Sequence, residues 1–148
     1  MKKLTLIALI LVVALMPLSV FGCGNASKVT YNVTVTVNDP EDASSPYVDK
    51  LALTIEVKEG YAPTVLDAVQ KACQDMEYEF TASDDGLSVK SIAEIAEFDE
   101  IGEDGKTVAA SSYWSFLLNG EEPKTGRAGN TEIKDGDVIV FNFVTDRY

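Results

Sequence analysis

The sequence predicts an α+β domain in which a single helix packs on one face of a mixed β-sheet. Alternation of apolar and polar residues, typical of half-buried strands, recurs between residues 29 and 144. One segment, residues 63–76, changes to the 3.6-residue period of an amphipathic helix. Turn-forming sequences such as Asn119-Gly120 separate the strand patterns. The chain is long enough for one domain with its own core, which we expect to span residues 29–148.

Ahead of this domain, residues 1–22 are typical of a secretory signal peptide, with two lysines, a long apolar run and then small residues. The segment Val20-Phe21-Gly22-Cys23 resembles a bacterial lipobox, in which the cysteine carries a diacylglycerol thioether and further acyl chains such as palmitate. Residues 23–28 would then be the lipidated cysteine and a short tether. We therefore expect a protein anchored to a bacterial cell membrane and facing its extracytoplasmic side. An ordinary cleaved signal and an uncleaved membrane anchor are the alternatives.

The composition excludes several classes of function. A net charge of −12 argues against nucleic acid as a partner, because contacts to phosphate need Lys and Arg. The absence of histidine rules out Ser-His and Cys-His nucleophile pairs and removes the commonest metal ligand. With only two cysteines, Cys23 and Cys73, the chain cannot form a four-cysteine zinc site. We therefore expect no catalytic activity, no cofactor and, apart from the acidic loop at residues 99–105 considered below, no metal centre.

The first two strands are predicted over residues 29–37 and 51–57. In the first, Val and Tyr alternate with Thr and Asn; in the second, Leu, Ile and Val alternate with Ala, Thr and Glu. Residues 38–46 between them are rich in turn-forming Pro, Asp, Asn and Ser. We expect these strands to form an antiparallel hairpin with a long loop.

The helix predicted over residues 63–76 has a clear start signal. Thr64 can act as the N-cap, and Asp67 follows three residues later, which resembles a capping box. Cys73 lies on the apolar side of the pattern, so we expect a buried, unreactive thiol. The apolar face that packs on the sheet is predicted to contain Val65, Leu66, Val69, Ala72, Cys73 and Met76.

After the helix, strand patterns occur at residues 78–80, 86–92, 113–118 and 138–144. Residues 93–112 are ambiguous, and their acids and glycines favour a loop with at most a short strand or helical turn. Both faces of 113–118 are fairly apolar, which predicts an inner strand covered on each side. Asn119-Gly120, directly after it, predicts a type I′ turn. This order of elements fits a β-grasp, ubiquitin-like arrangement best.

Acidic and glycine-bearing loops give weaker functional signals. An EF-hand loop needs acids at alternate positions and Gly at position six, but a loop started at Asp99 has Asp104 at position six, so the pattern fails. For residues 99–105, a looser oxygen cage around a cation and a solvated acidic loop both stay open. Residues 125–130 contain two glycines and Arg127 without the strand-to-helix context of a phosphate loop, so we interpret them as a surface loop.

Several segments carry a resemblance to a known family. The sequences TVLDAVQKA, GLSVKSI, YWSFLLNGEEP and KDGDVIVFNF resemble the transcobalamin-like C-terminal domain family. In bacteria this domain occurs on secreted and lipid-anchored proteins, and it is similar to the small β-domain of transcobalamin and intrinsic factor. The resemblance covers residues 29–145. Its most specific parts are Tyr113-Trp114, Asn119-Gly120 and Asp135-Gly136-Asp137 at their mutual spacing.

The resemblance implies a β-grasp-like fold and a candidate ligand, cobalamin or another corrinoid. In the vertebrate carriers, the corrin ring is held between a helical barrel and the β-domain, and loops beside the Tyr-Trp strand face the ring. Carried onto this chain, the implied ligand-binding residues are Tyr113, Trp114, Arg127, Ala128, Gly129 and Asn130.

Two functional hypotheses follow. The first is a non-enzymatic, lipid-anchored surface domain that binds a corrinoid or a similar planar molecule in a groove that contains Tyr113, Trp114 and residues 127–130. The second is a protein-interaction or cell-envelope module, whose strand edges or acidic loops contact a surface or transport protein. Trp114, the only tryptophan, is then either a core residue or an aromatic that flanks the ligand. A solvent-inaccessible Trp114 without an apolar hollow around it would favour the second hypothesis.

Overall fold

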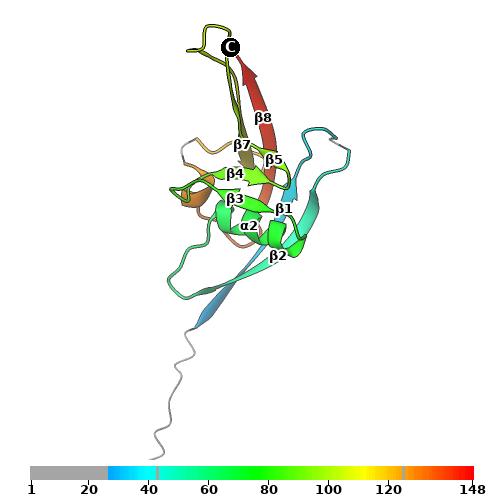
Figure 1. Ribbon diagram of the computed structural model, residues 1–148. Coiled ribbons are helices and arrows are strands. Elements are labelled where there is room, and N and C mark those ends of the chain that lie inside the picture. Colours follow the sequence, from blue (N-terminus) through cyan, green and yellow to red (C-terminus); the bar gives the residue numbers. More distant parts are fainter. Residues whose placement is uncertain (1–26, 43, 125) are drawn as a thin grey trace, which may run out of the picture.

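The computed structural model describes residues 27–42, 44–124 and 126–148 (Figure 1). The predicted signal peptide, the lipobox with Cys23 and most of the tether lie outside the described residues. In the part of the chain that is described, no helix has both the length and the apolar character needed to span a bilayer.

The main element is a five-stranded mixed sheet in the order β2-β1-β8-β7-β6. The first and last of its strands in the chain, β1 and β8, pair in parallel at the centre, and the other neighbours are antiparallel. Together with the α-helix that packs on it, this sheet confirms the predicted α+β class. Its strands are β1 (Lys28–Val37), β2 (Val48–Lys58), β6 (Asp99–Ile101), β7 (Val108–Leu118) and β8 (Val138–Arg147).

The antiparallel hairpin of β1 and β2 is confirmed. Their register runs from Lys28 opposite Lys58 to Val37 opposite Val48, with an irregularity between Val35 and Val37. Alternate residues of β1, including Val33, Val35 and Val37, are buried, whereas the Thr and Asn residues between them are not. The period-two pattern of the sequence therefore places one face of this sheet in the core.

Helix α2 (Val65–Asp75) covers that buried face, and its start is the predicted capping box. The Thr64 backbone N–H donates to the Asp67 carboxylate at 2.8 Å, and the Asp67 N–H donates to Thr64 Oγ1 at 3.3 Å. Cys73 is fully buried, and desolvation raises the pKa of its thiol to about 11. One predicted face residue is wrong: Met76 is the C-cap, where the helix ends, and is 43% exposed.

A small second sheet lies beside α2 on the same face of the main sheet (Figure 1). It consists of β3 (Phe80–Ala82), β4 (Val89–Ile92) and β5 (Ile95–Ala96), paired in that order. Val89 and Ile92 of β4 belong to the same core cluster as α2 and the main sheet. The strand predicted at 78–80 starts two residues later, because the chain first bonds back to the helix, where the Tyr78 N–H donates to the Cys73 C=O.

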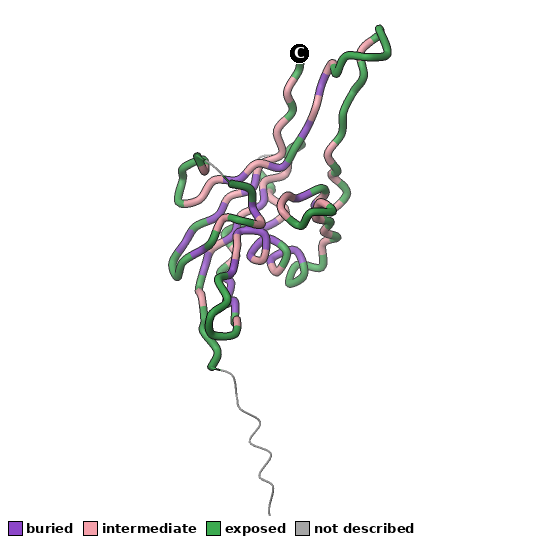
Figure 2. The backbone as a smooth tube through the Cα atoms, turned by 90° about the vertical axis from the view of Figure 1, so that its left-hand side faces the viewer, coloured by how far each residue is buried: buried purple, intermediate pink, exposed green. Residues whose placement is uncertain are grey.

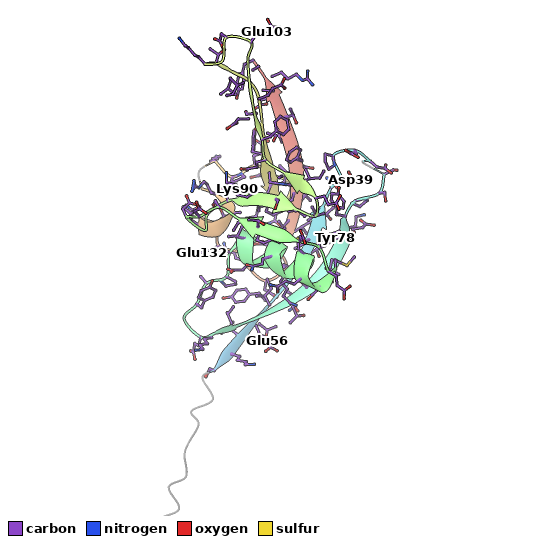
Figure 3. All side chains as sticks on the ribbon, viewed as in Figure 1. Asp39, Glu56, Tyr78, Lys90, Glu103 and Glu132 are labelled. Carbon is purple, nitrogen blue, oxygen red and sulfur yellow. The ribbon has the colours of Figure 1, made fainter. Side chains whose placement is uncertain are left out.

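Residues 93–112, where the sequence is ambiguous but favours a loop, contain the short strand that it allows there and further strand residues. β6 and the first half of β7 form an arm that continues the sheet past the core, with the tip at Glu103 (Figure 3). The arm is exposed, as Figure 2 shows, so its strand residues need not be apolar. Its acids and glycines therefore resemble those of a loop. The predicted two-sided cover of residues 113–118 is wrong, since Trp114 is 6% exposed but its neighbour Tyr113 is 42% exposed.

Candidate functional site

Two polar turns interlock at one end of β7 and β8, and we call them the turn cluster (residues 119–120 and 134–137). Asn119 and Gly120 have φ of +55° and +83°, and Leu118 and Glu121 exchange backbone hydrogen bonds across them, as the predicted type I′ turn requires. The Asn119 side chain donates to the Asp137 carboxylate at 2.8 Å and accepts from the Val138 N–H at 2.9 Å.

The second turn is tied to its surroundings in the same way. Buried Asp137 also accepts from the Lys134 N–H at 2.7 Å. Asp135 accepts from the backbone and the side-chain amide of Asn32, and these bonds lower the pKa of its carboxyl group. These Asn-Gly and Asp-Gly-Asp residues carry the family resemblance. Their hydrogen bonds link β1, β7 and β8 and stabilise the fold.

A hollow of about 340 Å³ lies beside β7. We call it the β7 slot. Its walls come from four places: the edge of β7 that faces away from β8, which we call the outer edge, the segment after the Asn-Gly turn, the start of β4, and Glu97. The slot is lined by Ser88, Val89, Glu97, Tyr113, Trp114, Ser115, Phe116, Glu122, Pro123, Gly126, Arg127 and Ala128.

Trp114 lines the slot while its indole belongs to the core. The ring packs edge-to-face on Phe143, with centroids 5.2 Å apart, and Nε1 donates to the Ile95 C=O at 3.3 Å. With 6% of the residue exposed, little of the ring is available for stacking on a ligand. Trp114 is therefore a core residue, as one of the two interpretations predicted. The hollow also lies next to it.

The segment 126–130 closes the slot and is docked on the turn at residues 83–88. The Gly129 N–H donates to the Leu87 C=O at 2.9 Å, and a Cβ at Gly129 would lie 2.2 Å from the Gly86 carbonyl oxygen. Asn130 Oδ1 accepts from the Arg127 N–H at 2.6 Å. Only glycine fits at position 129. Gly129, through this close contact, and Asn130, through its bond to Arg127, together set the path of the segment.

Charged groups border the slot on both sides. Arg127 forms an ion pair with Asp85, and Glu97 forms one with Lys90 at 3.0 Å; Figure 3 labels Lys90 on β4. The pKa of Asp85 is lowered first by the Ser83 hydroxyl and then by the Leu87 N–H, with Arg127 adding to both. Glu122, a further lining residue, is exposed.

Of the six residues predicted to bind a ligand, the slot brings four together: Tyr113, Trp114, Arg127 and Ala128. Gly129 and Asn130 are not among its lining residues and act through the path of the segment. The sequence prediction missed several wall residues, although the quoted family segments contained most of them. These are Ser88, Val89, Glu97, Ser115, Phe116, Glu122, Pro123 and Gly126.

A second hollow, of about 450 Å³, lies beyond the C-terminal end of α2. It is lined by Tyr47, Glu77, Tyr78, Glu79, Ala93 and Glu94. The two tyrosine rings meet edge-to-face at 5.6 Å. Burial and the nearby carboxylates, Asp39 first, raise the pKa of Tyr47. Figure 3 labels Tyr78 and Asp39 on this side of the molecule.

The acidic loop at the arm tip is held by its own hydrogen bonds. Asp104 Oδ1 accepts from the N–H groups of Thr107 and Lys106 at 2.9 and 3.0 Å, and these bonds, that of Thr107 first, lower the pKa of its carboxyl group. Within residues 27–42, 44–124 and 126–148, no group of three or more acidic or cysteine side chains could hold a metal ion.

A family model for a domain of unknown function, DUF4430, matches residues 62–145 of the chain. A protein from Ruminococcus gnavus ATCC 29149 with a provisional metal-binding assignment aligns at a TM-score of 0.44 and 16% identity, over 78% of this chain and 98% of its own. Haptocorrin in complex with Cbi aligns at 0.46 and 15% identity, over 77% of this chain but 25% of haptocorrin. No curated protein matches the sequence. The two structural likenesses are loose and do not bear on the chemistry of the slot.

Proposed function

The chain belongs to the DUF4430 family of domains of unknown function, and on this premise we propose that it is a non-enzymatic binding domain whose β7 slot receives part of a ligand. The observation that supports the proposal most is the hollow itself. It gathers four residues that the family resemblance implies for ligand binding, from segments more than ten residues apart in the chain. The proposal assigns no catalytic step to any residue.

The candidate ligand is a corrinoid, and this candidate comes from the sequence resemblance. The slot, about 340 Å³, is at the low end of small-molecule sites, which range from roughly 300 to 1,000 Å³. A corrin ring with its side chains is larger than that. The slot would therefore receive one edge of the ring, and the remainder would face solvent or a second protein surface.

Equilibrium dialysis of the full chain in detergent micelles against dicyanocobinamide, followed by corrin absorbance, tests this proposal. We expect saturable binding, weakened at least about tenfold, or 1.4 kcal/mol, by Ser88→Tyr, which fills the slot. Ser45→Tyr, on the exposed loop between β1 and β2, is the matched control and should leave binding unchanged. Absence of saturable binding up to about 1 mM would overturn the corrinoid candidate.

The second candidate function, a protein-interaction module, is favoured by one observation on the arm. Phe98, Ile101 and Val108 are each more than 40% exposed beside the short edge strand β6. Exposed apolar side chains next to a free strand edge are suited to a protein partner. Envelope proteins crosslinked through a photoreactive residue at Val108, and lost when Ile101→Lys is added to the same protein, would support this function.

We also propose that Cys23 carries the lipid anchor and that the domain faces the extracytoplasmic side of a bacterial membrane. The sequence pattern supports this. Strand β1 begins at Lys28, five residues after that cysteine and at the end of the molecule opposite the arm tip (Figure 1), so the arm would point away from the membrane. Metabolic labelling with an alkyne analogue of palmitate should mark the protein, and Cys23→Ala should abolish the label. Equal labelling of both proteins would overturn the anchor.

Finally, we propose that the fold is a β-grasp variant. The parallel pairing of β1 with β8 at the centre of the sheet and helix α2 across one face support this assignment. An experimental structure in which β1 and β8 are not parallel neighbours would exclude it.

A further inference from the structure

The outer edge of β7 is paired at both ends of the slot. On one side, the Ser112 N–H donates to the Phe98 C=O at 2.9 Å. On the other side, the Leu118 N–H donates to the Glu121 C=O at 2.9 Å. Both bonds point away from β8, which lies on the inner edge of β7. The slot occupies the interval between them.

The direction of the backbone groups inside this interval follows from strand geometry. In a strand, successive residues direct their N–H and C=O groups to opposite edges. The register of β7 with β8 is continuous from Ala110 to Leu118, so no bulge changes the alternation. Residues 112 and 118 point outward, and therefore Trp114 and Phe116 do so as well. The odd-numbered positions point inward, as the Asn119 N–H bonded to the Val138 C=O at 2.7 Å shows.

These outward groups have no partner within the described chain. Between residues that the structure describes, no strand pairing or other hydrogen bond joins the backbone N–H or C=O of Trp114 or Phe116. Backbone groups in the middle of a sheet are normally paired with a neighbouring strand. Here two donors and two acceptors face the slot instead, and the buried side chains of the same two residues hold them rigidly in place.

We propose that the slot recognises amide groups, which take the place of the missing neighbour strand and hydrogen-bond to the backbone of Trp114 and Phe116. This inference deepens the proposed binding function and rests on it. The two residues are two positions apart, so the ligand needs amides spaced by about 7 Å along one edge. Two kinds of molecule offer such groups: a short extended peptide, and a corrinoid, through the carboxamides on the rim of its ring.

The length of the interval limits the ligand. Phe98 and Glu121 already occupy the outer edge on either side, so a long strand of another folded protein cannot continue past them. The exposed Glu122 at the wall and the net charge of −12 oppose a second copy of this acidic chain. The ligand is therefore a short peptide segment or a small molecule with peripheral amides.

Amide hydrogen exchange of the ¹⁵N-labelled full chain in detergent micelles tests the inference. In the free protein, we expect Trp114 and Phe116 to exchange fast, and Tyr113, Ser115 and Leu117, which face β8, to exchange slowly. A bound amide ligand should slow the two fast positions by about tenfold when present at ten times its Kd.

Three probes distinguish the sources of the amide. Dicyanocobinamide carries carboxamides, dicyanocobyrinic acid heptamethyl ester has the same ring with esters that cannot donate, and acetyl-trialanine amide is a short peptide. We expect the ester to bind at least about tenfold more weakly than cobinamide, because the Trp114 and Phe116 carbonyls would stay unpaired.

Each outcome has a separate meaning. Equal binding of ester and cobinamide, or cobinamide binding without protection of Trp114 and Phe116, would overturn the amide inference and leave the corrinoid proposal standing. Protection by the peptide alone would support the inference and overturn the corrinoid candidate. Two results would overturn the inference: slow exchange of Trp114 and Phe116 already in the free protein, or no slowing of these two amides by any of the three probes.

Discussion

The turn cluster and the β7 slot lie at neighbouring points of β7, and the same family resemblance marks both, but their polar groups are used differently. In the turn cluster, the side chains of Asn119, Asp135 and Asp137 bond to backbone and side-chain groups of the protein itself. In the slot, backbone groups of Trp114 and Phe116 face a hollow of about 340 Å³. A residue pattern shared with a family therefore contains positions that hold the fold and positions that are open to a ligand. The two kinds differ in whether the polar groups already have hydrogen-bond partners within the described chain: those that hold the fold do, and those open to a ligand do not.

The largest effect should come from the slot residue that is also a core residue. Trp114→Ala removes a buried ring and leaves a cavity under β5 and Phe143, so we expect a loss of about 3–5 kcal/mol in the free energy of unfolding. Urea denaturation followed by far-ultraviolet circular dichroism measures it. Tyr113→Ala, at the exposed neighbouring position, is the control and should cost much less. Equal losses would show that the indole does not belong to the core.

The turn cluster should give the next largest effect. Asp137→Ala leaves the Lys134 N–H and the Asn119 amide without their acceptor at a buried position, for an expected loss of about 2 kcal/mol. The same urea experiment applies, with Asp84→Ala as the control because Asp84 is exposed. A loss near zero for Asp137→Ala would contradict the structural role that we assign to this cluster.

Arg127 at the slot should matter little for stability. Its ion pair with Asp85 is half exposed on both sides, so Arg127→Ala should cost less than about 1 kcal/mol, close to the cost of Lys124→Ala nearby. A larger loss would mean that the ion pair, and not the Gly129 backbone contact, holds the 126–130 segment in place.

The smallest effect concerns the titration of Asp85. Its pKa lies below the usual 3.8, chiefly through the Ser83 hydroxyl. Because the folded-state pKa is lowered, the stabilisation is complete above the usual value and is lost as the pH falls through the folded one. Titration of the carboxyl group by NMR should show a larger upward shift of the Asp85 pKa in Ser83→Ala than in Arg127→Ala. The opposite order would make Arg127 the main cause.

Much of the fold could be predicted because its causes are local. Alternating Val and Thr fix which face of β1 is buried, the Thr64–Asp67 pair starts the helix, and Asn119-Gly120 makes the turn whatever lies around it. The sequence allowed a short strand within residues 93–112 but did not predict the full arm. Exposed strands need no apolar face, so their acids and glycines are indistinguishable from those of a loop. The exposure of Tyr113 was not predicted either, because an aromatic residue on a strand can lie on a face that no other element covers.

For this protein, the sequence alone determined the α+β class, the hairpin, the helix with its capping box and the turn chemistry, since each depends on residues close together in the chain. The tertiary structure decided that Trp114 is a core residue and that Gly129 and Asn130 act through the path of their segment. It also decided that a slot interrupts the edge of β7. That interruption depends on where β6 ends and on the docking of the 126–130 segment against Gly86 and Leu87, and no local pattern specifies these contacts between separate parts of the chain.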